Sequence, residues 1–377
     1  MVKFIVEASQ NLKDCTVRAG VISDGGIIAQ TPIRVLNSTE LAHGDKINSS
    51  GLSVPRFPHK VFEITRFMKP QRVMDFIKNP EVSATITKNV RKISESAGNR
   101  IILFHPVLRK DMEISDEINE KLIELQIHCE HEVTTILDSY NSPVSSFKKR
   151  LKESIKQIKN SGNYSEPMPS IRMDMDNKLF NEKIDTCIEN NIRAINLTYA
   201  NIRDHFQNFM SLVKLARNKS TRSVWMHMSE TPRKILRQTS VSHLLPLVSI
   251  DSYALNSKPL PLGIIQRKEV IIKRFDSHTL GFLTPEEHIK IHGNTPACNC
   301  FVENRNKLTD TLSVYQAADL LSSAMQCHET NSSFYELNRS RRAIFNHKYD
   351  EYLRTKSHIN MPLKRLLKID LAQGELP

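Results

Sequence analysis

Two clusters of metal-binding residue types lie in the last third of the sequence. The first is Cys298-Asn299-Cys300, and the second is the adjacent pair Cys327 and His328. Thiolates and imidazoles grouped in this way are the ligands of structural zinc, which binds four of them in a tetrahedron. Neighbouring side chains on a helix point about 100° apart, so Cys327 and His328 compete for one position. The clusters predict one structural zinc ion; the alternative is a set of ordinary buried thiols.

A repeated Asp-Ser-Tyr triplet provides the second candidate, a catalytic site. The triplets are Asp138-Ser139-Tyr140 and Asp251-Ser252-Tyr253, and each comes after a short apolar run. Paired carboxylates at one site can divide the roles of nucleophile and hydrogen-bond acceptor between them. The simpler alternative is that each aspartate caps the helix after its strand. The repetition of the triplet favours a shared site.

The elements that must position these residues alternate between strands and helices. Short apolar runs recur eight times, each followed by a polar helical stretch. The runs are Ile33–Leu36, Val61–Ile64, Ile101–Phe104, Val133–Leu137, Ser170–Met173, Ala194–Leu197, Val224–Met228 and Leu247–Ile250. They predict an α/β fold, a (β/α)8 TIM barrel with catalytic groups at the C-terminal ends of its strands. A doubly wound open sheet ranks second, because no glycine-rich phosphate motif follows any strand.

In such a barrel the polar residues at the strand ends gather at one mouth. The candidates are His105, Asp138, Ser139, Tyr140, Asn141, Asp174, Asp176, Asn196, Tyr199, Met226, His227, Ser229, Asp251, Ser252 and Tyr253. On this interpretation Asp138 and Asp251 face the same mouth, after the fourth and the eighth strand.

The chain divides into four segments. Residues 1–31 predict an antiparallel β cap around the Asp24-Gly25-Gly26 turn, because Asp-Gly supplies the positive φ that hairpins need. Residues 32–285 form the barrel, residues 286–345 a zinc-binding subdomain, and residues 346–377 a basic tail.

Charge favours a polyanionic partner. Lys plus Arg (53) exceeds Asp plus Glu (41), a net charge of +12, and neutralising phosphates releases condensed counterions. Two basic stretches, Lys148–Lys159 and Arg339–Lys368, are candidates for phosphate contact, and solvated helix faces are the alternative. The apolar runs fall far short of the ~20 residues that cross a bilayer, and the start lacks a secretory signal. We therefore expect a soluble, cytoplasmic protein without a membrane partner.

The metal spacing resembles that of the tRNA-guanine transglycosylases, which are zinc-bearing (β/α)8 enzymes. Cys298, Cys300, Glu303 and His328 fall on the family's Cys-x-Cys-x-x-Cys and downstream His positions, with Glu303 in place of the third cysteine. The resemblance implies zinc bound by Cys298, Cys300 and His328, with Glu303 or Cys327 completing the set.

The resemblance extends over most of the chain. Arg18-Ala19-Gly20 and Thr31-Pro32 are similar to the family's N-terminal signatures, Asp138 to its base-recognition aspartate and Asp251 to its nucleophile. Two motifs depart from the family: Phe104-His105-Pro106 stands at the third strand, and Asn196-Leu197-Thr198-Tyr199 follows the sixth.

The resemblance implies a base-exchange reaction. Asp251 would attack the sugar C1′ and form a covalent glycosyl intermediate, and His105 would protonate the displaced guanine. Asp138 would recognise the incoming base, with further substrate contacts from Ser139, Asn141, Asn196 and His227. The departures favour the DNA-modifying branch, which replaces guanine with a 7-deazaguanine such as 7-cyano-7-deazaguanine, over tRNA as substrate. A homodimer or accessory subunits are compatible with this function.

Two other classes explain part of the sequence. A catalytically inactive barrel that binds nucleic acid accounts for the charge and for the absence of the third-strand aspartate. A metal-dependent (β/α)8 hydrolase accounts for the barrel, but it ranks last because no His-x-His follows the first strand to begin a metal centre.

Overall fold

The chain begins with a small antiparallel sheet. The computed structural model describes residues 2–12, 15–50, 57–110, 112–234, 239–256, 273–293 and 314–356. β1 (Lys3–Leu12) pairs with β2 (Cys15–Asp24), and β2 pairs with β3 (Ile27–Thr31). Gly25 and Gly26 join β2 to β3 with positive φ, which glycine adopts easily because it has no Cβ. The predicted N-terminal β cap is confirmed.

Eight parallel strands form the second sheet, in the order β6-β5-β4-β11-β10-β9-β8-β7. They are β4 (Ile33–Asn37), β5 (Val61–Phe67), β6 (Ile101–Val107), β7 (Val133–Ile136), β8 (Glu166–Arg172), β9 (Ala194–Thr198), β10 (Trp225–Thr231) and β11 (Ser252–Leu255). The first strand of the sheet, β4, pairs with the last, β11. The end strands β6 and β7 also pack together, and Glu132 beside β7 accepts a hydrogen bond from the Ile102 amide (2.9 Å). The sheet is therefore a nearly closed barrel, as predicted.

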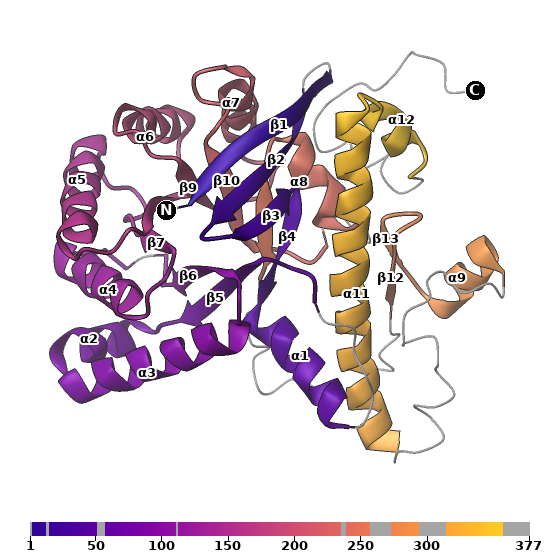
Figure 1. Cartoon of the computed structure of the whole chain (residues 1–377), viewed down its shortest axis with the longest axis horizontal. Coiled ribbons are helices and arrows are strands. Elements are labelled where there is room, and N and C mark those ends of the chain that lie inside the picture. The colour runs from indigo at the N-terminus through magenta and orange to yellow at the C-terminus, as the bar shows by residue number, and fades with distance from the viewer. Residues whose placement is uncertain are drawn as a thin grey trace.

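Helices cover the outside of this barrel (Figure 1). They are α1 (Ser38–Ser49), α2 (Pro70–Lys78), α3 (Pro80–Ala97), α4 (Asp116–His128), α5 (Val144–Asn160), α6 (Asn177–Glu189), α7 (Phe206–Arg217) and the short α8 (Leu244–Leu247). Caps begin several of them: Asp176, for example, accepts hydrogen bonds from the Lys178 and Leu179 amides at the start of α6. Within the described part of the chain, every helix is too short or too polar to cross a membrane.

The interior of the barrel is apolar toward the N-terminal ends of its strands. Alternate strand residues, including Val35, Leu103 and Trp225, form one buried cluster with Phe4 and Ile22 of the cap. Because side chains alternate across a strand, these positions face inward, while their neighbours pack against the helices. The β1–β3 cap therefore closes the N-terminal end of the barrel and leaves the C-terminal end as the mouth.

The C-terminal part of the chain adds a hairpin and a long helix. β12 (Arg274–Asp276) pairs with β13 (Gly281–Leu283), and α9 (Pro285–His292) follows. The 32-residue α11 (Val314–Phe345) runs along the barrel, before the short α12 (Tyr349–Arg354). Arg34 of β4 joins α11 to the barrel wall, since it donates to Glu329 (3.1 Å) and Ser333 (3.3 Å).

One predicted strand is wrong. The apolar run Leu247–Ile250 was expected to be the eighth strand, but its first residue ends α8 and the rest leads into β11, which begins only at Ser252. A short apolar run can be a buried helix or turn as readily as a buried strand, so the sequence pattern does not separate them. Asp251 consequently precedes the eighth strand instead of following it.

His131, two residues before β7, makes the stability of the core sensitive to acid. Burial lowers its pKa to about 4, because the imidazole is sealed between α3 and β6 and Ser94 Oγ lies 2.9 Å from its Nε2. The unfolded chain therefore binds a proton near pH 6.5, whereas the folded chain does so only near pH 4. Stability should fall by roughly 3 kcal/mol as the pH decreases through this interval.

Urea unfolding between pH 7 and pH 4 tests this expectation. His131→Gln should flatten the pH dependence, and the matched change His128→Gln, at an exposed position on α4, should leave it as it is. Equal pH dependence in the wild type and His131→Gln would contradict the assignment.

Candidate functional site at the barrel mouth

A chain of hydrogen bonds fills the middle of the barrel. Trp225 Nε1 donates to Ser252 Oγ (2.8 Å), and that hydroxyl then donates to His227 Nδ1 (2.9 Å). His227 Nε2 is left to donate to Glu63 Oε2 (2.9 Å), and Thr65 donates to the other oxygen of Glu63 (2.8 Å). Burial raises the pKa of Glu63, but His227 and His105 outweigh it and hold that pKa below its ordinary value. Glu63 is therefore a buried, fully bonded carboxylate.

His105 lies nearer the mouth. The Asn196 amide donates to His105 Nδ1 (3.3 Å) and to Ser170 Oγ (3.1 Å), which leaves His105 Nε2 to donate to Glu230 (3.2 Å). Burial lowers the pKa of His105. The hydrogen bond to Glu230 and the nearby Glu63 carboxylate raise that pKa by more than burial lowers it, so the net shift is upward. The carbonyl oxygen of Asn196 and the hydroxyl of Ser229 are buried and have no hydrogen-bond partner. The inner wall of the mouth therefore retains unused polar groups.

A small pocket of about 50 Å³ opens beside His105. Its walls include Glu230, Lys110, Tyr140 and Arg172. Arg172 donates to both oxygens of Asp174 (3.0 and 3.1 Å), and Lys110 lies 2.8 Å from the second oxygen. Burial raises the pKa of Asp174, but Arg172 and Lys110 outweigh it and lower that pKa below its ordinary value.

Further cations lie at this end of the barrel. Arg109, after β6, also lines the pocket, whereas Arg66, near the end of β5, and Arg72, in the first turn of α2, are not among its lining residues. We term these three residues, together with Lys110 and Arg172, the basic rim. Burial and the neighbouring Arg72 lower the pKa of Arg66. Among the described residues no carboxylate forms an ion pair with Arg66, so two arginines lie close together without a counter-ion between them. Phe67, also at the end of β5, is an exposed aromatic residue.

Asp251 lies at the opposite end of the barrel. It is fully buried, and both of its oxygens accept hydrogen bonds from Arg18 of the cap, one of them at 2.7 Å. The Met226 amide donates to the same carboxylate (2.8 Å). Burial raises the pKa of Asp251 to about 6, against the opposing effects of Arg18 and this amide. The expectation that Asp251 shares a mouth with Asp138 is wrong, because Asp251 stands before β11.

The second predicted aspartate is also held by cations. Asp138 accepts hydrogen bonds from Ser142 (2.6 Å), from Arg150 (3.0 Å) and from Lys183. Ser139 accepts from the Ile114 amide (2.9 Å), and Asn141 is exposed. Neither Asp138 nor Asp251 caps a helix, so the simpler alternative for these residues is wrong as well. Of the predicted site residues, His105 and Asp138 line the same pocket, Asn196 is bonded to His105, and His227 is the register partner of Asn196 on β10.

The zinc positions are described only in part, since Cys298, Cys300 and Glu303 lie outside the described residues. Cys327 is buried in the apolar cluster that includes Leu320 and Ala324, and burial raises its pKa to about 12. His328 faces the other way, with Nε2 2.9 Å from the Phe275 carbonyl oxygen of β12. Its Nδ1 lies 3.4 Å from Ser332 Oγ. An imidazole that ligates a metal commonly donates its second ring N–H to a backbone carbonyl, as His328 Nε2 does here.

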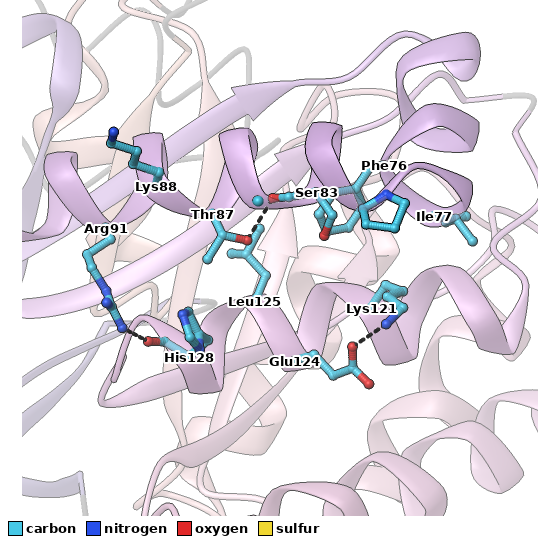
Figure 2. Close-up of a pocket in the computed structure, with 12 residues that line it drawn as sticks. Phe76, Ile77, Ser83, Thr87, Lys88, Arg91, Lys121, Glu124, Leu125 and His128 are labelled. Atoms are coloured by element: carbon cyan, nitrogen blue, oxygen red, sulfur yellow. Dashed lines mark hydrogen bonds and ion pairs between the residues drawn. The ribbon is translucent and has the colours of Figure 1, made fainter.

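A larger hollow of about 560 Å³ lies on the outside of the barrel, between α3 and α4 (Figure 2). Phe76 and Leu125 contribute to its apolar lining. At its edge Lys121 pairs with Glu124 (2.6 Å) and Arg91 donates to the His128 carbonyl (2.6 Å). These polar groups at the edge of the hollow are already bonded to one another and are not directed at a ligand. We therefore place the candidate site at the mouth.

Sequence reasoning did not find Glu63, Glu230 or the basic rim. Lys110 and Arg172 could have been noticed as cations that flank the predicted strand ends, but nothing in their spacing indicated that they meet at Asp174. In the two basic stretches that were noticed, Arg150 is buried against Asp138 and Arg341 pairs with Glu7 of β1 (2.5 Å), whereas Lys149 and Arg339 are exposed. Residues 357–368 of the second stretch lie outside the described residues.

Comparison with known protein-family models finds no match to this chain, and comparison with curated protein sequences finds none either.

The placement of Asp251 predicts a structural role for its charge. Asp251→Asn leaves the buried Arg18 guanidinium without a counter-charge, which typically costs about 3–5 kcal/mol. Urea unfolding should show a loss of that size. Asp176→Asn is the matched control, because Asn caps a helix about as well as Asp, and it should be nearly silent. An Asp251→Asn protein as stable as the wild type would refute this role.

Proposed function

We propose that this chain binds nucleic acid, DNA in preference to tRNA, at the mouth of its barrel, and that it does so without covalent catalysis by Asp251. The observation that carries the proposal is the basic rim, in which Arg66 lies near Arg72 and has no carboxylate ion-pair partner among the described residues. A cluster of cations with adjacent aromatic rings, here Phe67 and Tyr140, matches the charge of the phosphate backbone and the flat faces of unstacked bases.

The environments of the two expected aspartates support a binding role over base exchange. A nucleophile must reach the sugar C1′, whereas Asp251 is enclosed by Arg18 and the Met226 amide at the closed end of the barrel. A base-recognition carboxylate must offer free lone pairs, whereas Asp138 already accepts from Ser142, Arg150 and Lys183. The nucleophile inferred from the family resemblance, Asp251, is therefore out of reach of the mouth, and Asp138, which does line the mouth pocket, is held by internal partners.

A second candidate function retains catalysis but moves it to Glu230. This carboxylate lines the mouth pocket, its side chain is 16% exposed, and His105 donates to it. A glutamate oriented in this way could replace the aspartate as the group that attacks C1′ and later leaves. The 7-deazaguanine exchange then remains a proposal, with Glu230 as its nucleophile and Asn196 beside the base.

We keep structural zinc as part of the proposal, with Cys298, Cys300 and His328 as ligands. The orientation of His328 toward the Phe275 carbonyl supports its role, and bound zinc would cross-link the chain near β12. Cys327→Ala should therefore retain about one zinc per chain, while His328→Ala should lose most of it, as measured by elemental analysis. Loss of zinc from Cys327→Ala with retention in His328→Ala would reverse the ligand assignment.

Salt-dependent binding tests the main proposal. Fluorescence anisotropy with labelled single-stranded DNA, duplex DNA and tRNA should show affinity that falls steeply as salt rises, with DNA bound more tightly than tRNA. The double variant Arg66→Gln/Arg72→Gln should reduce the slope of log affinity against log salt by about 0.7–0.9 for each lost phosphate contact. The matched control Lys3→Gln/Lys60→Gln removes the same charge from exposed positions at the closed end and should leave the slope unchanged.

A base-exchange assay with labelled guanine separates the two candidates. No exchange, with salt-dependent binding intact, is the result expected for a binding protein. Exchange that survives in a folded Asp251→Asn protein and disappears in Glu230→Gln would favour the second candidate. Binding to none of the three nucleic acids at low salt would end the nucleic-acid proposal.

A further inference from the structure

Two cations and an aromatic ring converge on one carboxylate at the edge of the mouth pocket. Lys110 Nζ lies 4.1 Å from the centre of the Tyr140 ring, and the Arg172 guanidinium lies 5.3 Å from it. Both cations also bind Asp174, Lys110 at 2.8 Å and Arg172 through two hydrogen bonds. The three elements come from different parts of the chain: Lys110 follows β6, Tyr140 follows β7, and Arg172 ends β8.

The group is held in place and remains open to solvent. Tyr140 donates its hydroxyl to the Asp174 backbone carbonyl (3.2 Å), which fixes the ring beside the two cations. Side-chain exposure is 53% for Lys110, 26% for Arg172 and 17% for Asp174. A ligand at the mouth can therefore reach the cations, while the carboxylate lies deeper.

The charges of the group do not balance. Lys110 and Arg172 share Asp174 as their carboxylate, and Glu230, which lines the same pocket, is bonded to His105 instead. A guanidinium fork that binds the two oxygens of a carboxylate has the same geometry for two oxygens of a phosphate. The arrangement is that of an anion site in which an internal carboxylate occupies the place of the ligand.

We propose that Lys110 and Arg172 bind a phosphate group of a nucleotide at the barrel mouth, and that Asp174 is the internal anion which this phosphate displaces. The inference rests on the proposed nucleic-acid function and deepens it, because it assigns phosphate recognition to one pair of residues. Tyr140 is then released from one cation and can stack against the adjoining base. Asp174 also keeps the two cations oriented when no phosphate is bound.

Calorimetric titration of the full chain tests the clamp with three probes: inorganic phosphate, 2′-deoxyguanosine 5′-monophosphate and 2′-deoxyguanosine. We expect the nucleotide to bind at least about tenfold more tightly than the nucleoside, as charge-assisted bonds require. Arg172→Gln and Lys110→Gln should each remove most of that preference. Asp174→Asn removes the competing charge and should strengthen binding of phosphate and nucleotide about tenfold, with nucleoside binding unchanged.

Thermal melts of every variant identify loss of fold. If Arg172→Gln unfolds, Lys110→Gln still tests the clamp, because Lys110 is half exposed and its replacement should leave the fold intact. Lys178→Gln, at an exposed cation on the neighbouring α6, is the control and should change nothing. Equal binding of nucleotide and nucleoside, or weaker phosphate binding in Asp174→Asn, would overturn the clamp. If oligonucleotides still bind in a salt-dependent manner, only the clamp fails; if phosphate binds but no oligonucleotide does, the proposed function fails and the clamp stands.

Discussion

The buried contact between Arg18 and Asp251 is the interaction on which the arrangement of the barrel depends. One guanidinium from the cap binds both oxygens of Asp251 and also donates to the carbonyls of Arg222 (2.7 Å) and Val224 (2.8 Å). These acceptors precede β10 and β11, so Arg18 satisfies backbone groups that would otherwise be buried unpaired at the N-terminal ends of two strands. The cap is thereby attached to the barrel, that end is closed, and any ligand must approach from the C-terminal mouth.

The interior of the barrel changes from apolar to polar between its closed end and its mouth. The inward positions near the cap are apolar, but further along the strands Glu63, His227 and Ser252 face inward at the level where a barrel core is usually aliphatic. Their hydrogen bonds continue from Trp225 to Thr65, so each burial cost is offset by a bonded partner. This network supports the mouth from below and orients the carboxylate next to His105. The polar groups without partners, Asn196 Oδ1 and Ser229 Oγ, lie above it.

The cations of the fold differ in how they are paired. Arg150 on α5 is bonded to Asp138, and Arg233, which follows β10, is bonded to Glu329 on α11. At the mouth Lys110 and Arg172 share one carboxylate, Asp174, and Arg66 forms no ion pair with a carboxylate among the described residues. Net charge alone cannot reveal this difference, because paired and unpaired cations contribute equally to a sum over the sequence.

The sequence by itself determined the class of fold. Alternation of apolar runs with polar helical stretches indicated the parallel barrel, and seven of its eight strands lie where the runs predicted. Asp-Gly-Gly indicated the hairpin of the cap, since that local geometry needs only glycine.

Tertiary structure decided which residues meet at the candidate site. The run before Asp251 could be strand or turn, and only packing against Thr16 and Arg18 of the cap selected the turn and moved Asp251 to the closed end. Arg18 and Asp251 are 233 positions apart in the sequence. Lys110 and Tyr140 lie on the loops after β6 and β7, and Arg172 ends β8. Local pattern carries no information on such pairings, because charge partners are chosen by distance in space and by burial, neither of which exists before the chain folds.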